Sequence, residues 1–441
     1  MKNLIISIIS VILTASLSFS QNGWVPQQSR TTRNLNSIFF INSMTGWCVG
    51  DSNTVLRTTN GGSEWNTVLS SGYYRLSSVF FVNENTGWCC GGITFPLKSG
   101  VIYNTTNSGV NWFSIYGGGS SSVNRIFFIN GNTGFRADNS SLDFSSSGSV
   151  SKTTNGGINW FGGFYGQYEI TSVIFKDAIT GWAAGYWWSD VLGDSSAVFK
   201  TTDGGVSWLI KFREKGGEIS EMSFYNDRLW IAGKDSSILF SSDNGENWIR
   251  QSTNGRRKFN SVFFINKNTG WAAGYRYPDT TNIIKSTDGG ANWFNLKNIH
   301  ANTLNSLFFI DENTGWAAGN KYPSETGIIL KTITGGLTNL NYNPAQIPQE
   351  FRLYQNYPNP FNPVTQLEFI ISESGFVSLK VYDLLGKEVA VLVNEKLSPG
   401  RYKVEFNARN ARQGSNLSSG VYFVRMESGD FRDIKRMVLI K

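Results

Sequence analysis

One unit of sequence recurs along most of the chain, and this repeat constrains the fold more than any other feature. Its first copy begins with the strand-like stretch Leu35–Phe40 and continues through a Thr-Gly-Trp triplet to a turn segment that ends at Trp65. The Thr-Gly-Trp landmark falls, with spacings of about 41 to 48 residues, at Trp47, Trp88, Phe135, Trp182, Trp230, Trp271 and Trp316. This spacing is typical of four-stranded blades, so the sequence predicts a seven-bladed β-propeller.

The residues within each unit favour strands. The apolar stretches are short, rich in Phe, Ile and Val, and bounded by Gly, Asn, Asp or Ser. The chain of 441 residues has 47 glycines and 14% aromatic residues, and only 16% of its residues are charged. This composition indicates a packed chain with many tight turns, and no stretch predicts a helix.

The two ends of the repeat region complement each other. The turn segment ends in Trp in six units, but the seventh unit runs past Gly335 and Gly336 without one. Trp24 precedes Leu35 by the interval that separates Trp65 from the next unit, so we expect the first strand of the mature chain to complete the last blade. Such closure removes free sheet edges, and deleting residues 21–34 should therefore destabilise the ring.

The turn segment has the pattern Ser/Thr-x-Asp/Asn-x-Gly-x-x-Trp. A short Asp or Asn side chain accepts backbone N–H groups within a turn, Gly adopts positive φ, and Trp packs on neighbouring strands. We therefore expect a structural role for the acidic or amide residue of each copy, and an Asn cannot act as a general acid. These residues are Asn60, Asn107, Asn155, Asp203, Asp243 and Asp288.

These segments resemble the Asp-box (BNR) repeat, and the fuller unit resembles the seven-bladed propeller of the photosystem II stability and assembly factor type. The resemblance covers residues 24–336. It implies the propeller fold, whereas the same repeat also occurs in sialidases, xyloglucan-cleaving enzymes, sorting receptors and assembly factors. Nothing else in the sequence indicates photosynthesis, so we do not expect that role.

The two termini carry export signals. Residues 1–20 read as a secretory signal peptide, with Lys2 followed by an uncharged apolar stretch, and the propeller is expected over 21–336. An Asn- and Pro-containing linker, 337–349, precedes a second domain, 350–441, whose short strands predict a small Ig-like β-sandwich. Its Tyr-Pro-Asn-Pro-Phe-Asn-Pro opening at 357–363, Gly420-Val421-Tyr422 and terminal Lys441 resemble the type A C-terminal sorting domain of type IX secretion. The resemblance implies passage through the periplasm to the outer-membrane surface or the medium, with the type IX machinery as a partner of 350–441.

Loops of variable length predict the binding face of the propeller. In four-stranded blades the loops between the second and third strands and those between blades share one face, and here these loops vary while the opposite turns stay uniform. They carry aromatic and cationic residues, which suit sugar faces or acidic partners. The candidate ligand-binding residues are Tyr186, Trp187, Trp188, Tyr275, Tyr277, Tyr322, Arg256 and Arg257. Further aromatic and cationic residues of these loops include Tyr73, Tyr74, Arg75, Tyr116, Tyr168 and Lys258.

Several function classes are disfavoured. The single histidine, His300, excludes a multi-His metal site, and the three cysteines have no metal-ligand spacing, so neither a metal nor a cofactor is expected. The charges, 39 basic against 32 acidic, are mixed rather than concentrated, which argues against nucleic-acid binding. The chain lacks the Arg-Ile-Pro motif of sialidases, while loop carboxylates such as Asp51, Asp138 and Asp194 leave a two-carboxylate glycosidase open.

The sequence thus predicts an exported, monomeric, non-enzymatic propeller that binds a glycan or an envelope protein and has no transmembrane segment in its mature form. A protein-docking scaffold of the assembly-factor kind and a glycoside hydrolase of the Asp-box class remain as alternatives.

Overall fold

The structure, a computed structural model, contains strands and turns but no helix in the residues it describes. These are residues 23–93, 99–118, 121–142, 145–163, 165–187, 194–233, 237–253, 258–275, 283–296, 303–321, 326–336, 350–372, 375–397, 400–409 and 417–440. The chain divides into two compact units, Met1–Gly336 and Leu337–Lys441.

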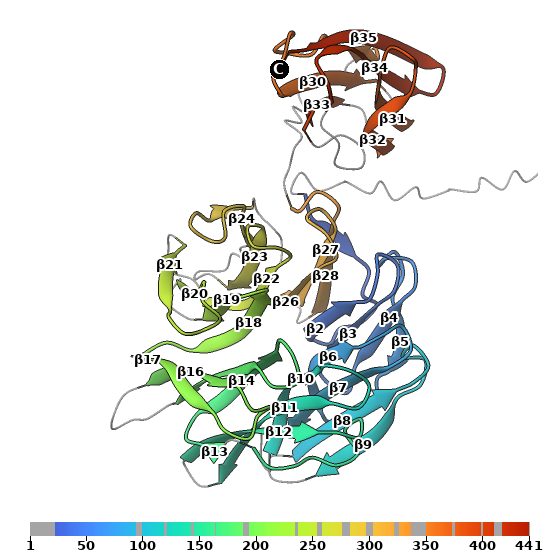
Figure 1. Cartoon of the computed structure of the whole chain (residues 1–441). Coiled ribbons are helices and arrows are strands. Elements are labelled where there is room, and N and C mark those ends of the chain that lie inside the picture. Colours follow the sequence, from blue (N-terminus) through green and yellow to red (C-terminus); the bar gives the residue numbers. More distant parts are fainter. Residues whose placement is uncertain are drawn as a thin grey trace, which may run out of the picture. The chain divides into compact units, whose positions relative to one another are not determined.

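The first unit is a propeller of seven four-stranded antiparallel sheets, which we number as blades 1 to 7 (Figure 1). The strands of blades 1 to 4 are β2 (Leu35–Phe40), β3 (Gly46–Gly50), β4 (Val55–Thr58), β5 (Asn66–Leu69); β6 (Arg75–Phe81), β7 (Gly87–Ile93), β8 (Ser99–Thr105), β9 (Phe113–Gly118); β10 (Ser121–Phe128), β11 (Gly134–Leu142), β12 (Ser145–Thr153), β13 (Tyr165–Gly166); and β14 (Glu169–Phe175), β15 (Gly181–Trp187), β16 (Ser195–Thr201), β17 (Leu209–Lys215). Those of blades 5 to 7 are β18 (Ile219–Tyr225), β19 (Arg228–Gly233), β20 (Ser237–Ser241), β21 (Ile249–Ser252); β22 (Lys258–Phe264), β23 (Gly270–Tyr275), β24 (Ile283–Ser286), β25 (Phe294–Asn295); and β26 (Thr303–Phe309), β27 (Gly315–Lys321), β28 (Thr326–Thr332), β1 (Val25–Gln27).

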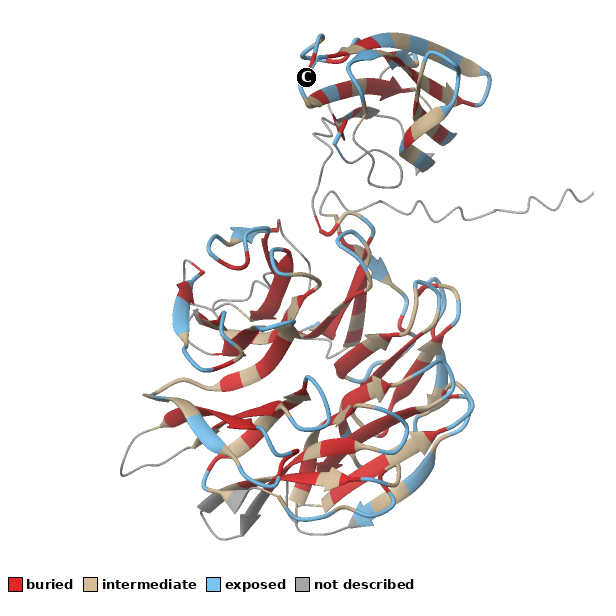
Figure 2. Ribbon diagram, in the orientation of Figure 1, coloured by how far each residue is buried: buried red, intermediate tan, exposed pale blue. Residues whose placement is uncertain are grey.

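The core lies between neighbouring blades. Buried residues fill the inner strands and the two middle strands of each blade, whereas the outermost strands carry exposed ones (Figure 2). The second strand is buried over at least five consecutive residues in six blades, which explains its small residues: in blade 4, Ala183 and Ala184 have no exposed surface. Gly185 follows them because a Cβ there would lie 2.2 Å from the backbone oxygen of Glu169. The tight pairing of first and second strands thus selects Gly at this position.

The amino-terminal strand closes the ring, as predicted. β1 pairs antiparallel with β28, with Pro26 opposite Leu330, and so becomes the outer strand of blade 7. The inner strands of blades 7 and 1 are also joined directly, because the Nδ2 atom of Asn305 donates to the backbone oxygen of Leu35 at 2.8 Å. Trp24 is buried and meets Phe309 edge-on, with ring centroids 5.8 Å apart.

The second unit is the predicted β-sandwich. One sheet contains β29 (Arg352–Leu353), β30 (Val364–Ile371) and β33 (Gly400–Asn407), and the other contains β31 (Gly375–Tyr382), β32 (Glu388–Leu397), β34 (Gly420–Ser428) and β35 (Phe431–Leu439). The opening motif is fastened to the last strand: Phe361 is buried, its N–H donates to the backbone oxygen of Val438, and its own oxygen accepts from Ile440. The first and last segments of the tail therefore stabilise each other.

Candidate binding face and central channel

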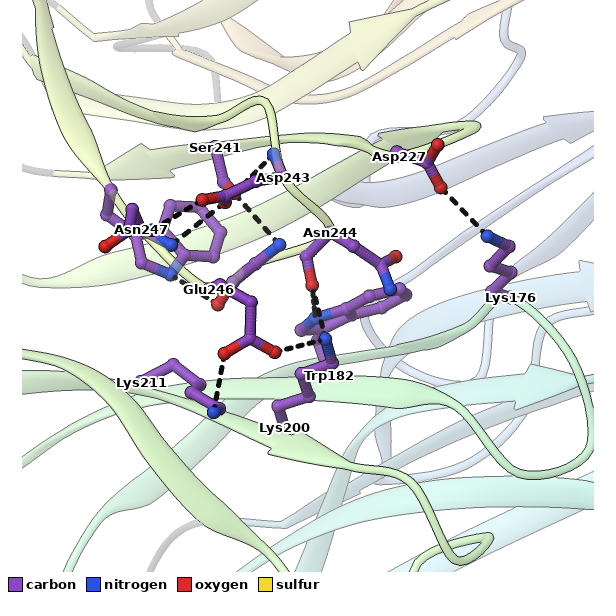
Figure 3. A network of polar contacts seen from close by, with 12 residues as sticks. Lys176, Trp182, Lys200, Lys211, Asp227, Ser241, Asp243, Asn244, Glu246 and Asn247 are labelled. Atoms are coloured by element: carbon purple, nitrogen blue, oxygen red, sulfur yellow. Dashed lines mark hydrogen bonds and ion pairs between the residues drawn. The ribbon is translucent and has the colours of Figure 1, made fainter.

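Each Asp-box is a self-contained turn between the third and fourth strands of its blade. In blade 5 the Ser241 hydroxyl donates to Asp243 at 2.8 Å, and Asp243 accepts the backbone N–H of Asn247 at 2.9 Å (Figure 3). The N–H and side chain of Asn247 hold the pKa of Asp243 at about 2. A carboxyl that is ionised at neutral pH has no proton to donate, so this geometry suits a brace and not a general acid.

The boxes also fasten neighbouring blades. The indole nitrogen of the landmark Trp in one blade donates to a backbone oxygen in the box of the next, at 2.8–3.2 Å. The six pairs are Trp47 to Ser108, Trp88 to Gly156, Trp182 to Asn244, Trp230 to Gly289, Trp271 to Gly335 and Trp316 to Gly61. The last pair runs from blade 7 to blade 1, so these bonds link all neighbouring blades except blades 3 and 4.

Blade 3 lacks this tryptophan and uses a cation in its place. Phe135 still stacks on Phe175 of blade 4 at 3.5 Å, but the bond to the box of blade 4 comes from the Lys152 ammonium, which donates to the oxygen of Gly204 at 3.1 Å. Lys200 adds the same contact from blade 4 to blade 5, at 2.8 Å from the oxygen of Asn244, and pairs with Glu246 (Figure 3). The contacts between blades therefore explain why the box turn has the same geometry from one blade to the next.

The predicted binding face carries few free aromatic rings among the described residues. Tyr186 is half-buried, and its hydroxyl donates to Glu169 at 2.9 Å; burial, followed by the charge of Glu169, raises the pKa of Tyr186. Trp187 ends β15 and packs against the core between blades 3 and 4, while Tyr275 ends β23 at intermediate exposure. Tyr73, in contrast, is 91% exposed. Trp188, Tyr277, Tyr322, Arg256 and Arg257 lie outside the described residues, as does His300.

The inner strands of the seven blades surround a central channel. Charged residues lie at its mouth on the predicted binding face. Arg75 and Glu169 begin the inner strands β6 and β14, Glu218 directly precedes β18, and Lys258 begins β22. They make polar contacts close to the mouth: Arg75 lies 3.5 Å from Asp51 of blade 1, and Lys258 lies 2.6 Å from Glu218. The mouth therefore presents both signs of charge around its rim.

The inner strands enclose a cavity of about 220 Å³. Five phenylalanines line one level of it, with successive ring centroids 4.8–5.5 Å apart, and they are Phe263, Phe308, Phe39, Phe80 and Phe127. Nearer the charged mouth the wall is polar, and Arg125 of β10 forms an ion pair there with Glu221 of β18. The channel is thus polar at one level and aromatic at the next.

Blade 3 also holds a buried ion pair that sequence reasoning missed. Arg136 and Asp138 of β11 lie 3.0 Å apart, where blade 4 has Ala183 and Gly185. The guanidinium is 4.3 Å from the centre of the Tyr116 ring. Burial outweighs the attraction of the cation and raises the pKa of Asp138 to about 6. Asp138, which the sequence predicts to lie near a loop, lies within β11. An alignment of the seven units with one another reveals both departures from the repeat.

The cysteines and carboxylates give no sign of a metal centre in the described part of the chain. Cys48, Cys89 and Cys90 are buried and free, and burial raises the pKa of the Cys90 thiol to about 12. No group of three or more His, Cys, Asp or Glu side chains able to hold a metal occurs there. Nor do the described residues include a helix that could span a membrane.

Fold, boxes and tail together define an exported β-propeller of the Asp-box class with a secretion-sorting domain. Residues 17–163 and 167–256, more than half of the chain, match the family described as photosynthesis system II assembly factor YCF48, and the chain belongs to this family. Residues 355–441 match the secretion system C-terminal sorting domain, which directs export by type IX secretion to the cell surface or beyond.

Solved structures support the propeller fold. A structure titled "YCF48 bound to D1 peptide" is 24% identical, with a TM-score of 0.55 over 72% of this chain and 98% of that one. YCF48 from Cyanidioschyzon merolae is 21% identical, with a TM-score of 0.52 over 70% and 98%. The structure of U3-55K is 10% identical, with a TM-score of 0.52 over 70% and 98%. The comparison with curated proteins finds no match.

Proposed function

We propose that the propeller is a docking scaffold for a protein partner at the cell surface, and that the face around the charged channel mouth is the contact surface. The observation that carries this proposal is the rim formed by Arg75, Glu169, Glu218 and Lys258, which offers both signs of charge to a partner. Charge patterns of this kind steer association and fix the orientation of a partner.

The described aromatic residues favour a protein over a polysaccharide. A sugar shelf needs exposed ring faces, but the Tyr186 hydroxyl is engaged with Glu169 and Trp187 packs on the core. Tyr73, fully accessible beside the mouth, fits the aromatic anchor that protein interfaces often contain. The related YCF48 structure bound to a D1 peptide supports peptide or protein recognition by this fold.

The proposal is tested by binding the purified mature chain to cells that lack the gene for it. We expect saturable binding that disappears when the cells are first treated with protease. The double variant Arg75→Glu, Lys258→Glu should bind at least about tenfold more weakly, because it reverses two rim charges. Arg250→Glu, a charge reversal on the outer strand β21, is the matched control and should bind normally.

A glycan-binding propeller would behave differently in the same assay. Binding would survive protease, would be retained on insoluble polysaccharides, and would be lost in Trp187→Ala, Trp188→Ala rather than in the charge-reversed variant. That combination would replace protein docking with the glycan alternative. Turnover of a polysaccharide would instead favour a hydrolase.

A further inference from the structure

The seven blades provide an internal comparison for the channel wall. Two positions after the first buried apolar residue of each inner strand, five blades have a serine, and these are Ser37, Ser78, Ser172, Ser261 and Ser306. Blades 3 and 5 have Arg125 and Glu221 at this position instead. We call these seven residues the collar. Five copies of the repeat have the same residue at this position, and two have side chains of opposite charge. Such a departure from the repeat indicates a local requirement other than folding.

The serines show what the fold requires of the collar. Each hydroxyl oxygen accepts a backbone N–H from the next blade at 3.0–3.4 Å, for example that of Val79 on Ser37 and that of Ile38 on Ser306. Serine thus links neighbouring blades, including blade 7 to blade 1. Arg125 cannot make this link, because a guanidinium is a donor only. The charged pair therefore forgoes at least one such link between blades.

The collar presents hydrogen-bond donors to the cavity. Once its oxygen accepts a backbone N–H, each serine still has an O–H proton, and no acceptor for it occurs among the described residues. Arg125 has five N–H groups, and in the described part of the chain its hydrogen bond runs to Glu221. The collar thus offers the serine O–H groups and the Arg125 N–H groups to a ligand, and a carboxylate supplies acceptor oxygens for them in pairs.

The Arg125–Glu221 pair is placed to exchange partners. It spans blade 4, since Arg125 comes from β10 and Glu221 from β18, and both side chains line the cavity. The Arg125 side chain is 30% exposed and that of Glu221 is 11% exposed. An ion pair withdrawn in part from solvent adds little net stability relative to residues that pack without charge. Glu221 therefore acts as an internal carboxylate that neutralises Arg125 when no other is present.

The level of the channel that the phenylalanines line determines which apolar group a carboxylate ligand must have. The five phenylalanines offer ring faces and edges around a space without charged groups, so they favour an aromatic or branched aliphatic body. We propose that the central channel binds a small amphipathic carboxylate. Its carboxylate takes Arg125 and the serine hydroxyls, and its apolar body packs against the phenylalanines. This site is independent of the docking face, because it involves neither Arg75 nor Lys258.

The proposal is tested by calorimetric titration of the purified full-length mature chain with 3-phenylpropionate, indole-3-acetate and 4-methylpentanoate. We expect saturable binding of at least one acid, and binding of its carboxamide should be about tenfold to a hundredfold weaker because the charge-assisted bonds are lost. Arg125→Ser, which restores the residue of the other blades, should lose the preference for acid over amide. No binding of any of the three acids up to about 10 mM would overturn the proposal.

Glu221→Ser provides the sharper variant because it predicts a gain. Removing the internal carboxylate frees Arg125, so affinity for the acid should rise by about tenfold while affinity for the amide stays unchanged. Equal or weaker binding of the acid in a variant with an unchanged circular dichroism spectrum would contradict the role of Glu221. Arg250→Ser removes one positive charge from the outer strand β21 and should bind the acid as the parent does. If Arg250→Ser weakened binding of the acid as much as Arg125→Ser, net charge alone would explain the effect.

Discussion

The buried pair in blade 3 gives the most quantitative prediction. Restoring the residues of the other blades with Arg136→Ala, Asp138→Gly should stabilise the propeller at neutral pH. Burial raises the pKa of Asp138 from 3.8 to about 6, which corresponds to about 3 kcal/mol between the two protonation states. Replacement of a buried ion pair by well-packed apolar residues is stabilising by about 1–4 kcal/mol in other proteins, which agrees in sign and size.

The pH dependence separates this reasoning from a general packing effect. Folded Asp138 keeps its proton to a higher pH than the unfolded chain does, so the free energy of unfolding falls as the pH rises from about 4 to about 6. The full penalty is present above that window and absent below it. The advantage of the double variant over the parent should therefore be up to about 3 kcal/mol larger at pH 7.5 than near pH 4.

Urea unfolding at both pH values, followed by tryptophan fluorescence, measures these differences. The single variant Asp138→Gly is the control: it leaves Arg136 buried without its partner and should be less stable than the double variant at pH 7.5. A double variant that is no more stable than the parent at pH 7.5, or that has the same advantage at pH 4, would refute the reasoning.

Three further predictions concern assembly and export. Trp230→Phe removes the bond to Gly289 while keeping an aromatic ring, as Phe135 does naturally, and should cost about 1 kcal/mol in urea unfolding, against about 3–5 for Trp230→Ala; equal losses would contradict the fastening role. Trp24→Ala should lower the stability by about 3–5 kcal/mol because it empties the site against Phe309, and a change within about 0.5 kcal/mol would mean that β1 is dispensable. Deletion of 350–441 should trap the chain in the periplasm, which fractionation and immunoblotting detect; its normal appearance outside would contradict the sorting role.

The fold was predictable because its determinants are local and repeated. The landmark Trp and the box turn recur at near-constant spacing, so counting them gave the number of blades, and the missing seventh box Trp revealed closure by Trp24. The bonds between a Trp and the next box follow the same repeat.

The candidate site was less predictable because it depends on departures from the repeat. Arg125, Glu221, Arg136 and Asp138 stand where other blades have Ser, Ala, Cys, Ile or Gly, and a search for common landmarks passes over such positions. The loop residues depend on side-chain contacts that spacing does not determine. Tyr186, for example, is a candidate ligand-binding residue, and its hydroxyl donates to Glu169 across a strand pair whose register the sequence alone does not determine.

Photo-crosslinking on living cells tests protein docking at the channel mouth most directly. A crosslinking residue replaces Tyr73 beside the mouth in one version of the exported chain and Ile179 in another. Ile179 is also exposed and lies in the turn between β14 and β15, at the opposite face. The account predicts a discrete protein adduct from position 73 that disappears in Arg75→Glu, Lys258→Glu, and none from position 179. An adduct from position 179 alone, or no protein adduct from position 73, would contradict docking at this face.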